Sequence, residues 1–460
     1  MSLDRVLARI DNECDSALER LFQIVRIPSI SADPAYRDDC RRAAEWCSSN
    51  LNEAGFTAGV RPTIGHPMVV GNYDGAGANA PHVLFYGHYD VQPIDPLELW
   101  TRDPFDPAVI DVDGEKQISG RGASDDKGQL MTFVEAARAW IAETGGLPIN
   151  VTVFLEGEEE SASPSMIPFL TENADELKAD VALVCDTNMW DRATPAISTM
   201  LRGLVYEDVV VHAASHDLHS GYYGSAACNP IHVLAAILAD LHDETGRITI
   251  PGFYDGVPEV SAEQKAQWAE LGFDEKAFFG GIGLSEPAGE AGYSTLEQIW
   301  SRPTAEVNGI IGGYTGEGAK TVIPALASAK ISFRLVGDQD PETIRENFRA
   351  FVTERLPADC RAEFRSHGGD RAVSQPVDNP WVQKTRTALS SEWGRDAALI
   401  GMGGSIPVVT QFKTLLGMDT VLVGFALEDD RIHSPNEKYN LASFQRGTRS
   451  WARILAALAA

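Results

Sequence analysis

The chain has few basic residues for its length and lacks a long apolar run. Among its 460 residues, 38 are lysine or arginine and 66 are aspartate or glutamate, so the formal net charge is -28. This excess of negative charge opposes non-specific binding to nucleic acid or to an anionic membrane surface. No segment approaches the roughly 20 apolar residues that a membrane-spanning helix needs. We therefore expect a small-molecule substrate, no nucleic-acid partner and no membrane partner.

Cysteine is also scarce, and its spacing carries no motif. The six cysteines are scattered and contain no Cys-x-x-Cys pair, so they support neither a disulfide framework nor a thiolate zinc site. The segment from Met1 to Leu21 places apolar side chains at helical spacing among charged ones and lacks the apolar core of a signal peptide. These features predict a cytoplasmic protein. The cysteines are Cys14, Cys40, Cys47, Cys185, Cys228 and Cys360.

The signatures of several common enzyme classes are missing. The sequence has no Gly-x-Ser-x-Gly nucleophile elbow, which argues against an α/β-hydrolase. It has neither a Gly-x-Gly-x-x-Gly dinucleotide fingerprint nor a His-Glu-x-x-His zinc helix. Residues 313–321 resemble a phosphate-binding loop, but Ala319 separates Gly318 from Lys320 and breaks the required Gly-Lys adjacency.

Four apolar runs lead to ionisable residues. Continuous apolar runs of this length are typical of strands that are covered on both faces. In open α/β sheets, ligands and chemistry gather beyond the carboxyl ends of such strands. Histidine with carboxylate is a ligand set for zinc or a similar divalent metal, so the pattern predicts a metal-centred hydrolase. The runs are Val83 to Tyr86 before His88 and Asp90, Val151 to Leu155 before Glu156 to Glu160, Val181 to Cys185 before Asp186, and Val421 to Val423 leading towards His433.

Two acidic segments strengthen this prediction, although each has an ordinary structural alternative. Asp125 and Asp126 stand between glycines just before an expected helix, where carboxylates also serve as helix caps. The run Glu158 to Glu160 follows an apolar strand, and adjacent carboxylates repel one another unless a cation lies nearby. On an extended segment, one of two neighbouring acids can bind metal while the other faces a water as general base. A solvated surface run is the alternative.

The order of expected elements predicts two domains, with the second inserted into the first. Helices and strands alternate up to about residue 195, which is typical of an α/β fold with a doubly wound, mostly parallel sheet. From Arg202 the order becomes strand, helix, strand, helix, with a polar insertion at about 250–300, which predicts an α+β domain. We expect residues 1–198 and 377–460 to form the catalytic domain and residues 199–376 the inserted domain. Expected helices are 41–54, 128–143, 230–242, 341–355 and 441–458, and expected strands of the insertion are 204–213 and 328–335.

From about Leu18 onward the sequence resembles the zinc-dependent exopeptidases and amidohydrolases. This family includes carnosine and cytosolic non-specific dipeptidases, aminoacylase, acetylornithine deacetylase and succinyl-diaminopimelate desuccinylase, and the resemblance is closest to the dipeptidase branch. So many ordered blocks are hard to obtain by chance. The blocks are GHYDVQP (87–93), GRGASDDKG (120–128), EGEEES (156–161), HDLHSG (216–221), GAKTVIP (318–324), FRLV (333–336), GGSIPV (403–408) and HSPNEK (433–438).

The resemblance implies a site with two divalent metal ions, zinc by expectation, with manganese or cobalt as alternatives. Asp125 would bridge the two ions, and the peptide bond between Asp125 and Asp126 would be cis. Asp90 would hold a ligating histidine, and Glu159 would be the general base that takes a proton from water. The remaining ligands would be His88 and Asp186 on one ion and Glu160 and His433 on the other.

The resemblance also makes the inserted domain a lid that forms a homodimer. His219 would reach the partner's site and stabilise the oxyanion, and Thr321 would likewise be contributed across the dimer. Arg334 and Ser405 would meet the carboxylate end of the substrate. One departure is visible, because Gly401-Met402 stands where many relatives carry Arg-Glu, so the pocket for the amino end of the substrate is not predicted.

The expected function is hydrolysis of the amide bond of dipeptides or similar small peptides with a free C-terminal carboxylate. One alternative is an N-acyl-amino-acid or N-carbamoyl amidohydrolase, or a deacetylase, that uses the same metal site. A more distant alternative is a non-catalytic homologue that only binds small molecules. Such a homologue would be signalled by loss of Glu159 or a ligand, and all six positions are intact.

Overall fold

The computed structural model describes residues 2–460, which form two compact units. The first unit contains the described residues up to Thr199 together with Gln375–Ile400 and Gln411–Ala460. The second unit contains Met200–Ser374 and Gly401–Thr410. The first unit is thus assembled from segments that lie on both sides of the second unit in the sequence. The assignment of these parts as a catalytic domain and a lid stays a prediction.

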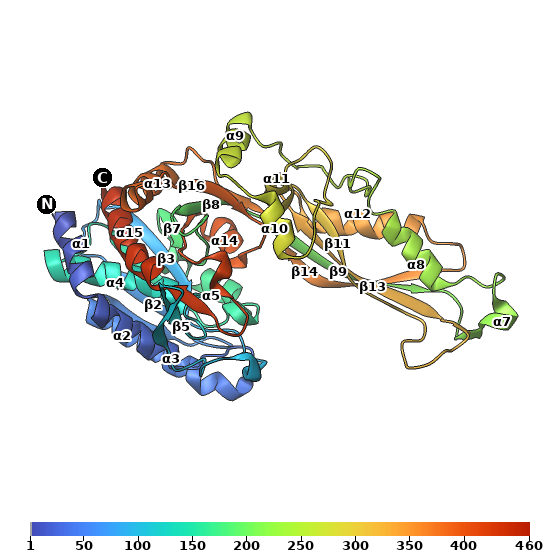
Figure 1. Cartoon of the computed structure of the whole chain (residues 1–460), viewed down its shortest axis with the longest axis horizontal. Helices are drawn as coiled ribbons and strands as arrows, with labels where there is room; N and C mark the ends of the chain where they lie inside the picture. Colours follow the sequence, from blue (N-terminus) through green and yellow to red (C-terminus); the bar gives the residue numbers. More distant parts are fainter. Residues whose placement is uncertain (1) are drawn as a thin grey trace. The chain divides into compact units, whose positions relative to one another are not determined.

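The first unit is built on a mixed sheet with a parallel centre (Figure 1). The strand order is β1-β2-β6-β3-β7-β17-β8-β15, and β3 runs parallel to both β6 and β7, as β17 does to β7. The outer pairs are antiparallel. This arrangement confirms the predicted α/β class. The strands of this sheet are β1 (Thr57–Arg61), β2 (Met68–Tyr73), β3 (His82–His88), β6 (Asn150–Glu156), β7 (Val181–Val184), β8 (Ala196–Leu201), β15 (Val373–Ser374), β16 (Ala398–Met402) and β17 (Asp419–Leu422). The residues of β15 and the last residues of β8 and β16 belong to the second unit.

Both faces of the parallel centre are buried, as the continuous apolar runs predict. Phe85 and Tyr86 are neighbours on β3, so their side chains point to opposite faces, and both are fully buried. Phe85 stacks on Phe133 of α4 at 3.8 Å between ring centroids, whereas Tyr86 meets Phe412 at 5.8 Å. The helices of this unit are α1 (Ser2–Asn12), α2 (Cys14–Val25), α3 (Arg37–Ala54), α4 (Lys127–Thr144), α5 (Met166–Glu172), α6 (Ala174–Leu177), α13 (Pro380–Trp393) and α15 (Leu441–Ala459).

A small antiparallel sheet joins the end of the chain to the loop before α4. It pairs β18 (Lys438–Asn440) with β5 (Glu115–Ser119), which in turn pairs with β4 (Ala108–Val112). This pairing brings the segment that carries His433 close to the segment that carries Asp125. Among residues 2–460, no helix combines the length and the apolar character that crossing a bilayer requires.

The second unit contains a four-stranded antiparallel sheet of order β11-β13-β9-β14, with α8 and α12 along one face (Figure 1). Alternate residues of β9, such as Val205 and Val209, are buried against this helical layer, which includes Leu234 and Phe348. The elements are β9 (Gly203–His212), β10 (Leu218–His219), α7 (Ser220–Tyr223), α8 (Pro230–Ala239), α9 (Ala262–Glu270), α10 (Glu275–Gly281), α11 (Thr295–Trp300), β11 (Thr304–Gly312), β12 (Val322–Ile323), β13 (Leu326–Leu335), α12 (Pro341–Glu354) and β14 (Arg361–Asp370).

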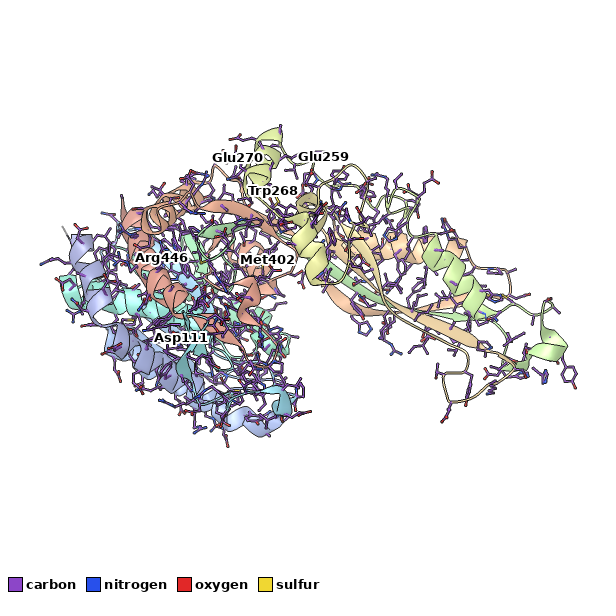
Figure 2. The ribbon with its side chains drawn as sticks, viewed as in Figure 1. Asp111, Glu259, Trp268, Glu270, Met402 and Arg446 are labelled. Carbon is purple, nitrogen blue, oxygen red and sulfur yellow. The ribbon has the colours of Figure 1, made fainter. Side chains whose placement is uncertain are left out.

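The polar insertion between α8 and β11 forms short helices rather than a loop. Trp268 of α9, labelled in Figure 2, packs edge-on against Trp300 of α11. The ring centroids are 5.1 Å apart. Ser294 caps α11 and forms a reciprocal capping box with Glu297. The helix is therefore anchored at its first turn by the capping box and at its last residue by the Trp268 contact.

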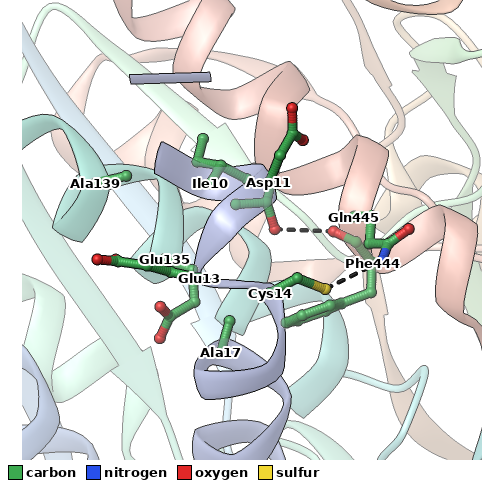
Figure 3. Close-up of a pocket in the computed structure, with 10 residues that line it drawn as sticks. Ile10, Asp11, Glu13, Cys14, Ala17, Glu135, Ala139, Phe444 and Gln445 are labelled. Atoms are coloured by element: carbon green, nitrogen blue, oxygen red, sulfur yellow. Dashed lines mark hydrogen bonds between the residues drawn. The ribbon is translucent and has the colours of Figure 1, made fainter. Parts of the chain in front are cut away.

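A cavity of about 280 Å³ lies between α1, α2, α4 and α15 of the first unit (Figure 3). Cys14 lines it and accepts a hydrogen bond from Gln445 at 3.0 Å, and Glu135 lines it while paired with Arg20 at 2.6 Å. None of the residues that the sequence predicts for the functional site lines this cavity.

Candidate metal centre

Three parallel strands deliver three of the five predicted ligands to one edge of the sheet. β3 ends at His88, and β7 ends just before Asp186. β6 runs parallel to β3, with Glu156 opposite His88, and a short 3-10 turn follows at Glu159–Ser161. Since the carboxyl ends of parallel strands meet at the same edge, side chains that are distant in the sequence come together there.

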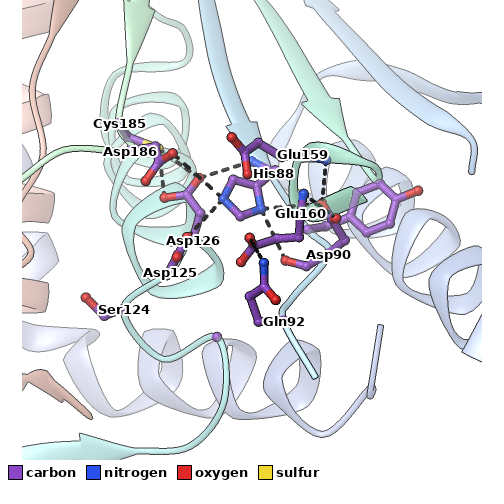
Figure 4. Close-up of polar contacts among 12 residues, drawn as sticks. His88, Asp90, Gln92, Ser124, Asp125, Asp126, Glu159, Glu160, Cys185 and Asp186 are labelled. Atoms are coloured by element: carbon purple, nitrogen blue, oxygen red, sulfur yellow. Dashed lines mark hydrogen bonds and ion pairs between the residues drawn. The ribbon is translucent and has the colours of Figure 1, made fainter. Parts of the chain in front are cut away.

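The Asp125 carboxylate lies between two histidines. Its Oδ1 is 3.0 Å from Nε2 of His88, and its Oδ2 is 2.9 Å from Nε2 of His433. His88 is also 4.0 Å from Asp186, and His433 is 3.2 Å from Glu160. The structure thus brings all five predicted ligands into two groups that share Asp125, and within each group the ligand atoms lie within 4.8 Å of one another. Figure 4 shows His88, Asp125, Glu160 and Asp186 of this set.

Asp90 connects the His88 side of the cluster to the Glu159 side. The Nδ1 atom of His88 is 3.1 Å from the carbonyl oxygen of Asp90 and 3.4 Å from its carboxylate. The same carboxylate accepts hydrogen bonds from Ser31 Oγ at 2.6 Å and from the backbone N–H of Glu160 at 3.0 Å. Asp90 therefore orients the imidazole and fixes the start of the turn that carries the two glutamates, which is the kind of outer support that metal sites use.

A residue to which the sequence analysis gave no role, Glu437, holds the loop that carries Asp125. Its buried carboxylate accepts backbone hydrogen bonds from Gly122 and Ser124, each at 2.9 Å, and from Asp125 at 3.1 Å. It also pairs with Arg121 at 2.8 Å. The peptide bond between Asp125 and Asp126 is cis, as the resemblance implies. The only sequence signal for Glu437 was its place in the HSPNEK block.

The electrostatics of the cluster are those of a site built for cations. Burial, together with the negative charges of Asp186 and Glu160, raises the pKa of Glu159 to about 9. Burial and the charge of Asp125 raise the pKa of Asp186 to about 7. Hydrogen bonds to Asp125 and Glu160 raise the pKa of His433 to about 10. In the absence of a metal ion, these three raised pKa values mean that the cluster binds protons, which shows that its crowded carboxylates favour positive charge.

The donor set fits a pair of divalent metal ions. Two imidazoles and three carboxylates are the ligand types that zinc, manganese and cobalt accept in hydrolytic sites. The Oε1 atom of Glu160 is buried and faces Nε2 of His433 at 3.2 Å, so both atoms would be available to one cation once the imidazole has lost its proton. His433 has a φ of 61°, an uncommon conformation for a residue other than glycine, and its side chain is 52% exposed.

In the second unit, a two-strand sheet places His219 beside Thr321. His219 of β10 pairs with Val322 of β12, and the N–H of Ser220 donates to the carbonyl of Thr321 at 3.1 Å. The Nδ1 atom of His219 accepts the N–H of Gly221 at 2.9 Å. In the neutral ring the proton then resides on Nε2, so His219 presents an N–H donor on its other side.

The second unit also joins Arg334 to Ser405, the two residues predicted to meet a carboxylate. The Nη1 atom of Arg334 donates to Ser405 Oγ at 3.0 Å, and Ser405 Oγ donates to the carbonyl of Arg202 at 2.5 Å. The Nε atom of Arg202 donates to the carbonyl of Gly403 at 2.9 Å, whereas its Nη1 is buried without a partner in the described chain. Burial and the charge of Arg334 lower the pKa of Arg202 to about 10. Two guanidinium groups therefore stand close together, a setting that favours an anion.

Of the two residues that depart from the family pattern, Gly401 and Met402, the glycine has a packing reason. A Cβ atom added to Gly401 would lie 2.5 Å from Cβ of Trp300, so the tryptophan at the end of α11 excludes any larger residue there. Met402 ends β16 and is half-buried (Figure 2). Its thioether carries no charge, so this position cannot pair with a substrate ammonium group.

An α/β unit that gathers histidines and carboxylates at the ends of parallel strands defines a metal-dependent hydrolase. The chain belongs to peptidase family M20/M25/M40, whose sequence profile matches residues 84–457. It is accordingly a metallopeptidase, and the predicted family is confirmed.

Named relatives cover the whole chain. The Cys-Gly metallodipeptidase of Schizosaccharomyces pombe is 31% identical over 475 residues, covering 100% of this chain and 99% of the relative. The Beta-Ala-His dipeptidase of Homo sapiens is 28% identical over 480 residues, covering 99% of this chain and 93% of the relative. A solved M20 family metallo-carboxypeptidase from Sulfolobus solfataricus superposes with a TM-score of 0.82 at 30% identity, covering 96% of this chain and 99% of that one.

Proposed function

We propose that this metallopeptidase is a dipeptidase with two metal ions that cleaves small peptides carrying a free C-terminal carboxylate. The observation that carries the proposal is the Asp125 carboxylate, whose two oxygens are each about 3 Å from a different histidine. A carboxylate held in this way would be able to bridge two cations. The relatives named above as dipeptidases support the substrate class.

The two ions would be held by His88 and Asp186 on one side and by Glu160 and His433 on the other, with Asp125 between them. Ions bound there would supply a Lewis acid for the scissile carbonyl and lower the pKa of a water molecule. Zinc is the proposed metal, with manganese or cobalt as alternatives.

Glu159 is proposed as the general base. It adjoins Glu160 just beyond the carboxyl end of β6. Its backbone N–H donates to the Asp90 carboxylate at 3.3 Å, and this hydrogen bond holds the backbone from which the Glu159 side chain extends. Burial raises the pKa of Glu159, and cations bound beside it would lower that pKa again by favouring the carboxylate, the form that accepts a proton from water. Glu159 then delivers that proton to the amine that leaves.

Arg334 and Ser405 are proposed to bind the C-terminal carboxylate of the substrate. A guanidinium can grip a carboxylate through two parallel hydrogen bonds. Arg202 supports this role, because it holds Gly403 and Ser405 in place and adds a second positive charge whose Nη1 lacks a partner in the described chain.

A homodimer is proposed to complete the site, with His219 of the partner subunit and Thr321 of the partner subunit acting on the substrate. The free Nε2–H of the imidazole suits a developing oxyanion. Within residues 2–460, β11 pairs only with β13, and Ile310 and Ile311 on this edge strand are 54% and 63% exposed. An apolar unpaired strand edge is suited to pairing with a second copy.

A cytoplasmic location is part of the same proposal. The six cysteines are free, as is usual for proteins in a reducing compartment.

Metal removal combined with a substrate panel tests the proposal. Chelation should abolish hydrolysis of unblocked dipeptides, and zinc, manganese or cobalt should restore it. Full activity in protein that elemental analysis shows to be metal-free would overturn the mechanism.

The uncharged Met402 favours one alternative, an amidohydrolase for substrates without a free amino group. Parallel assays on each dipeptide and on its N-acetyl and N-carbamoyl forms decide between the two. Release of amino acids only from the blocked forms would establish the alternative.

A further inference from the structure

The second unit brings together two cysteines that lie far apart in the sequence. The Sγ atoms of Cys228 and Cys360 are 3.3 Å apart, although 132 residues separate them. Both side chains are half-buried, so neither is sealed from solvent. By contrast, Cys40, Cys47 and Cys185 are buried, and the Cys14 sulfur accepts a hydrogen bond from Gln445.

The two cysteines lie at the base of a chain excursion that carries His219. The chain leaves the four-stranded sheet after His212, the last residue of β9, and returns at Cys228, just before α8. His212 is opposite Arg361, the first residue of β14. Cys360 therefore stands next to the point at which the excursion begins, and Cys228 marks the point at which it ends.

We propose that Cys228 and Cys360 form a reversible disulfide that closes the base of residues 213–227 and restrains the segment carrying His219. A bond between these sulfurs requires them to approach from 3.3 Å to about 2.05 Å, a small movement for two half-buried side chains. A cross-link at the base of a loop reduces the conformations that the loop can visit.

The oxidant is a low-molecular-weight disulfide. A thiolate of Cys228 attacks one sulfur of that disulfide, which forms a mixed disulfide and releases one small thiol. The Cys360 thiolate then attacks Sγ of Cys228, which forms the internal bond and releases the second small thiol. The two protons lost by the protein end on the two released thiols. Burial and the hydrogen bond to Cys228 raise the pKa of Cys360 to about 11, which is why Cys228 is assigned the first attack.

The chemical test is a thiol count on the full-length metal-loaded protein. After incubation with oxidised glutathione and removal of the excess, the denatured protein should contain four free thiols instead of six, and dithiothreitol should restore six. Peptide mapping should find residues 228 and 360 in one cross-linked peptide. Retention of six thiols, or a stable glutathione adduct in place of the cross-link, would overturn the proposal.

Two variants sharpen the result. Cys228→Ser should remove the cross-linked peptide, whereas Cys14→Ser, which changes a half-buried cysteine of the first unit, should leave it unchanged. The wild-type measurement stands on its own if Cys228→Ser folds poorly.

Amide hydrogen exchange tests the proposed restraint of residues 213–227 separately from the thiol count. Oxidation should slow exchange in residues 213–227 and leave α4 of the first unit unchanged. Equal exchange rates in the oxidised and reduced protein would overturn the restraint even if the disulfide forms. An effect on hydrolysis rests on the proposed role of His219, whereas the thiol count and the exchange rates do not, so the two proposals can fail separately.

Discussion

The carboxylate of Glu437 accepts the backbone N–H of Asp125 at 3.1 Å across 312 residues of sequence. Glu437 also receives two further backbone N–H groups and the Arg121 guanidinium, so this one side chain sets the shape of the loop that carries the shared ligand. The position of Asp125 therefore depends on a residue that touches none of the proposed ions.

Glu437→Gln should weaken metal binding about 10- to 100-fold, because outer support of this kind typically has that effect on affinity. The substitution removes the ion pair to Arg121 and one acceptor while keeping the side-chain size. Metal competition with a chelator of known affinity measures the change. Glu428→Gln, at an exposed position nearby in the sequence, is the matched control. Unchanged affinity in the first variant would assign Glu437 to folding alone.

Metal binding should release protons at neutral pH. The pKa of His433 is raised to about 10 in the metal-free protein, so this imidazole is protonated at pH 7 and must lose its proton before it can bind an ion. Affinity should accordingly rise with pH, by about tenfold per pH unit for each proton released. Calorimetry in buffers of different ionisation enthalpy counts the protons. A binding enthalpy independent of the buffer would contradict this assignment.

Glu159→Gln should lose about 10²- to 10⁴-fold in kcat while keeping both metal ions, because the amide cannot accept a proton from water. Turnover and elemental analysis on the same preparation measure the two properties. Glu172→Gln, an exposed change on α5, should behave as wild type. Near-normal turnover of Glu159→Gln would move the base to another residue.

Arg334→Met should reduce kcat/KM for free dipeptides about 10- to 100-fold, the usual range for losing hydrogen bonds to a charged group. The variant should act equally on dipeptides and on their C-terminal amides, whereas the wild type should prefer the free acids. Arg365→Met, an exposed arginine of β14 in the same unit, serves as control. Equal rates of the wild type on acids and amides would argue against the exopeptidase role.

A mixture of His219→Ala and Glu159→Gln should regain activity if the site is shared between subunits. Each variant should be nearly inactive alone. With random exchange, about half of the dimers become mixed and contain one site in which both residues are intact. Mass spectrometry confirms the exchange. If mixed dimers form and activity stays at the level of the single variants, His219 acts within its own chain or has no catalytic role.

Local patterns were sufficient to predict four strands of the first unit, β3, β6, β7 and β17, and the ionisable residues that follow the first three of them. The apolar run from Val83 to Tyr86 became β3, and His88 at its carboxyl end is fully buried, with Asp90 and Asp125 as its polar neighbours. The predicted helix at 128–143 is α4, which extends one residue further at each end. These features depend on neighbours in the sequence.

Contacts between distant segments could not be predicted in the same way. Nothing near Glu437 in the sequence indicates that it would bind the loop of Asp125, and the spacing of Cys228 and Cys360 carries no signal. The reason for a glycine at position 401 is also not visible in the sequence, because it is the packing of Trp300 against this residue. In each case the determining partner is brought there by the fold.

The first unit is built from segments that are synthesised before and after the second unit. The ribosome produces His88, Asp125 and Asp186 early, so one group of three ligands exists before the second unit has been made. The other group needs His433, which emerges only after the whole of Met200–Ser374. A growing chain thus has the residues of one group long before it has those of the other, and Asp125 gains its hydrogen bond to Glu437 only when the last segment has emerged.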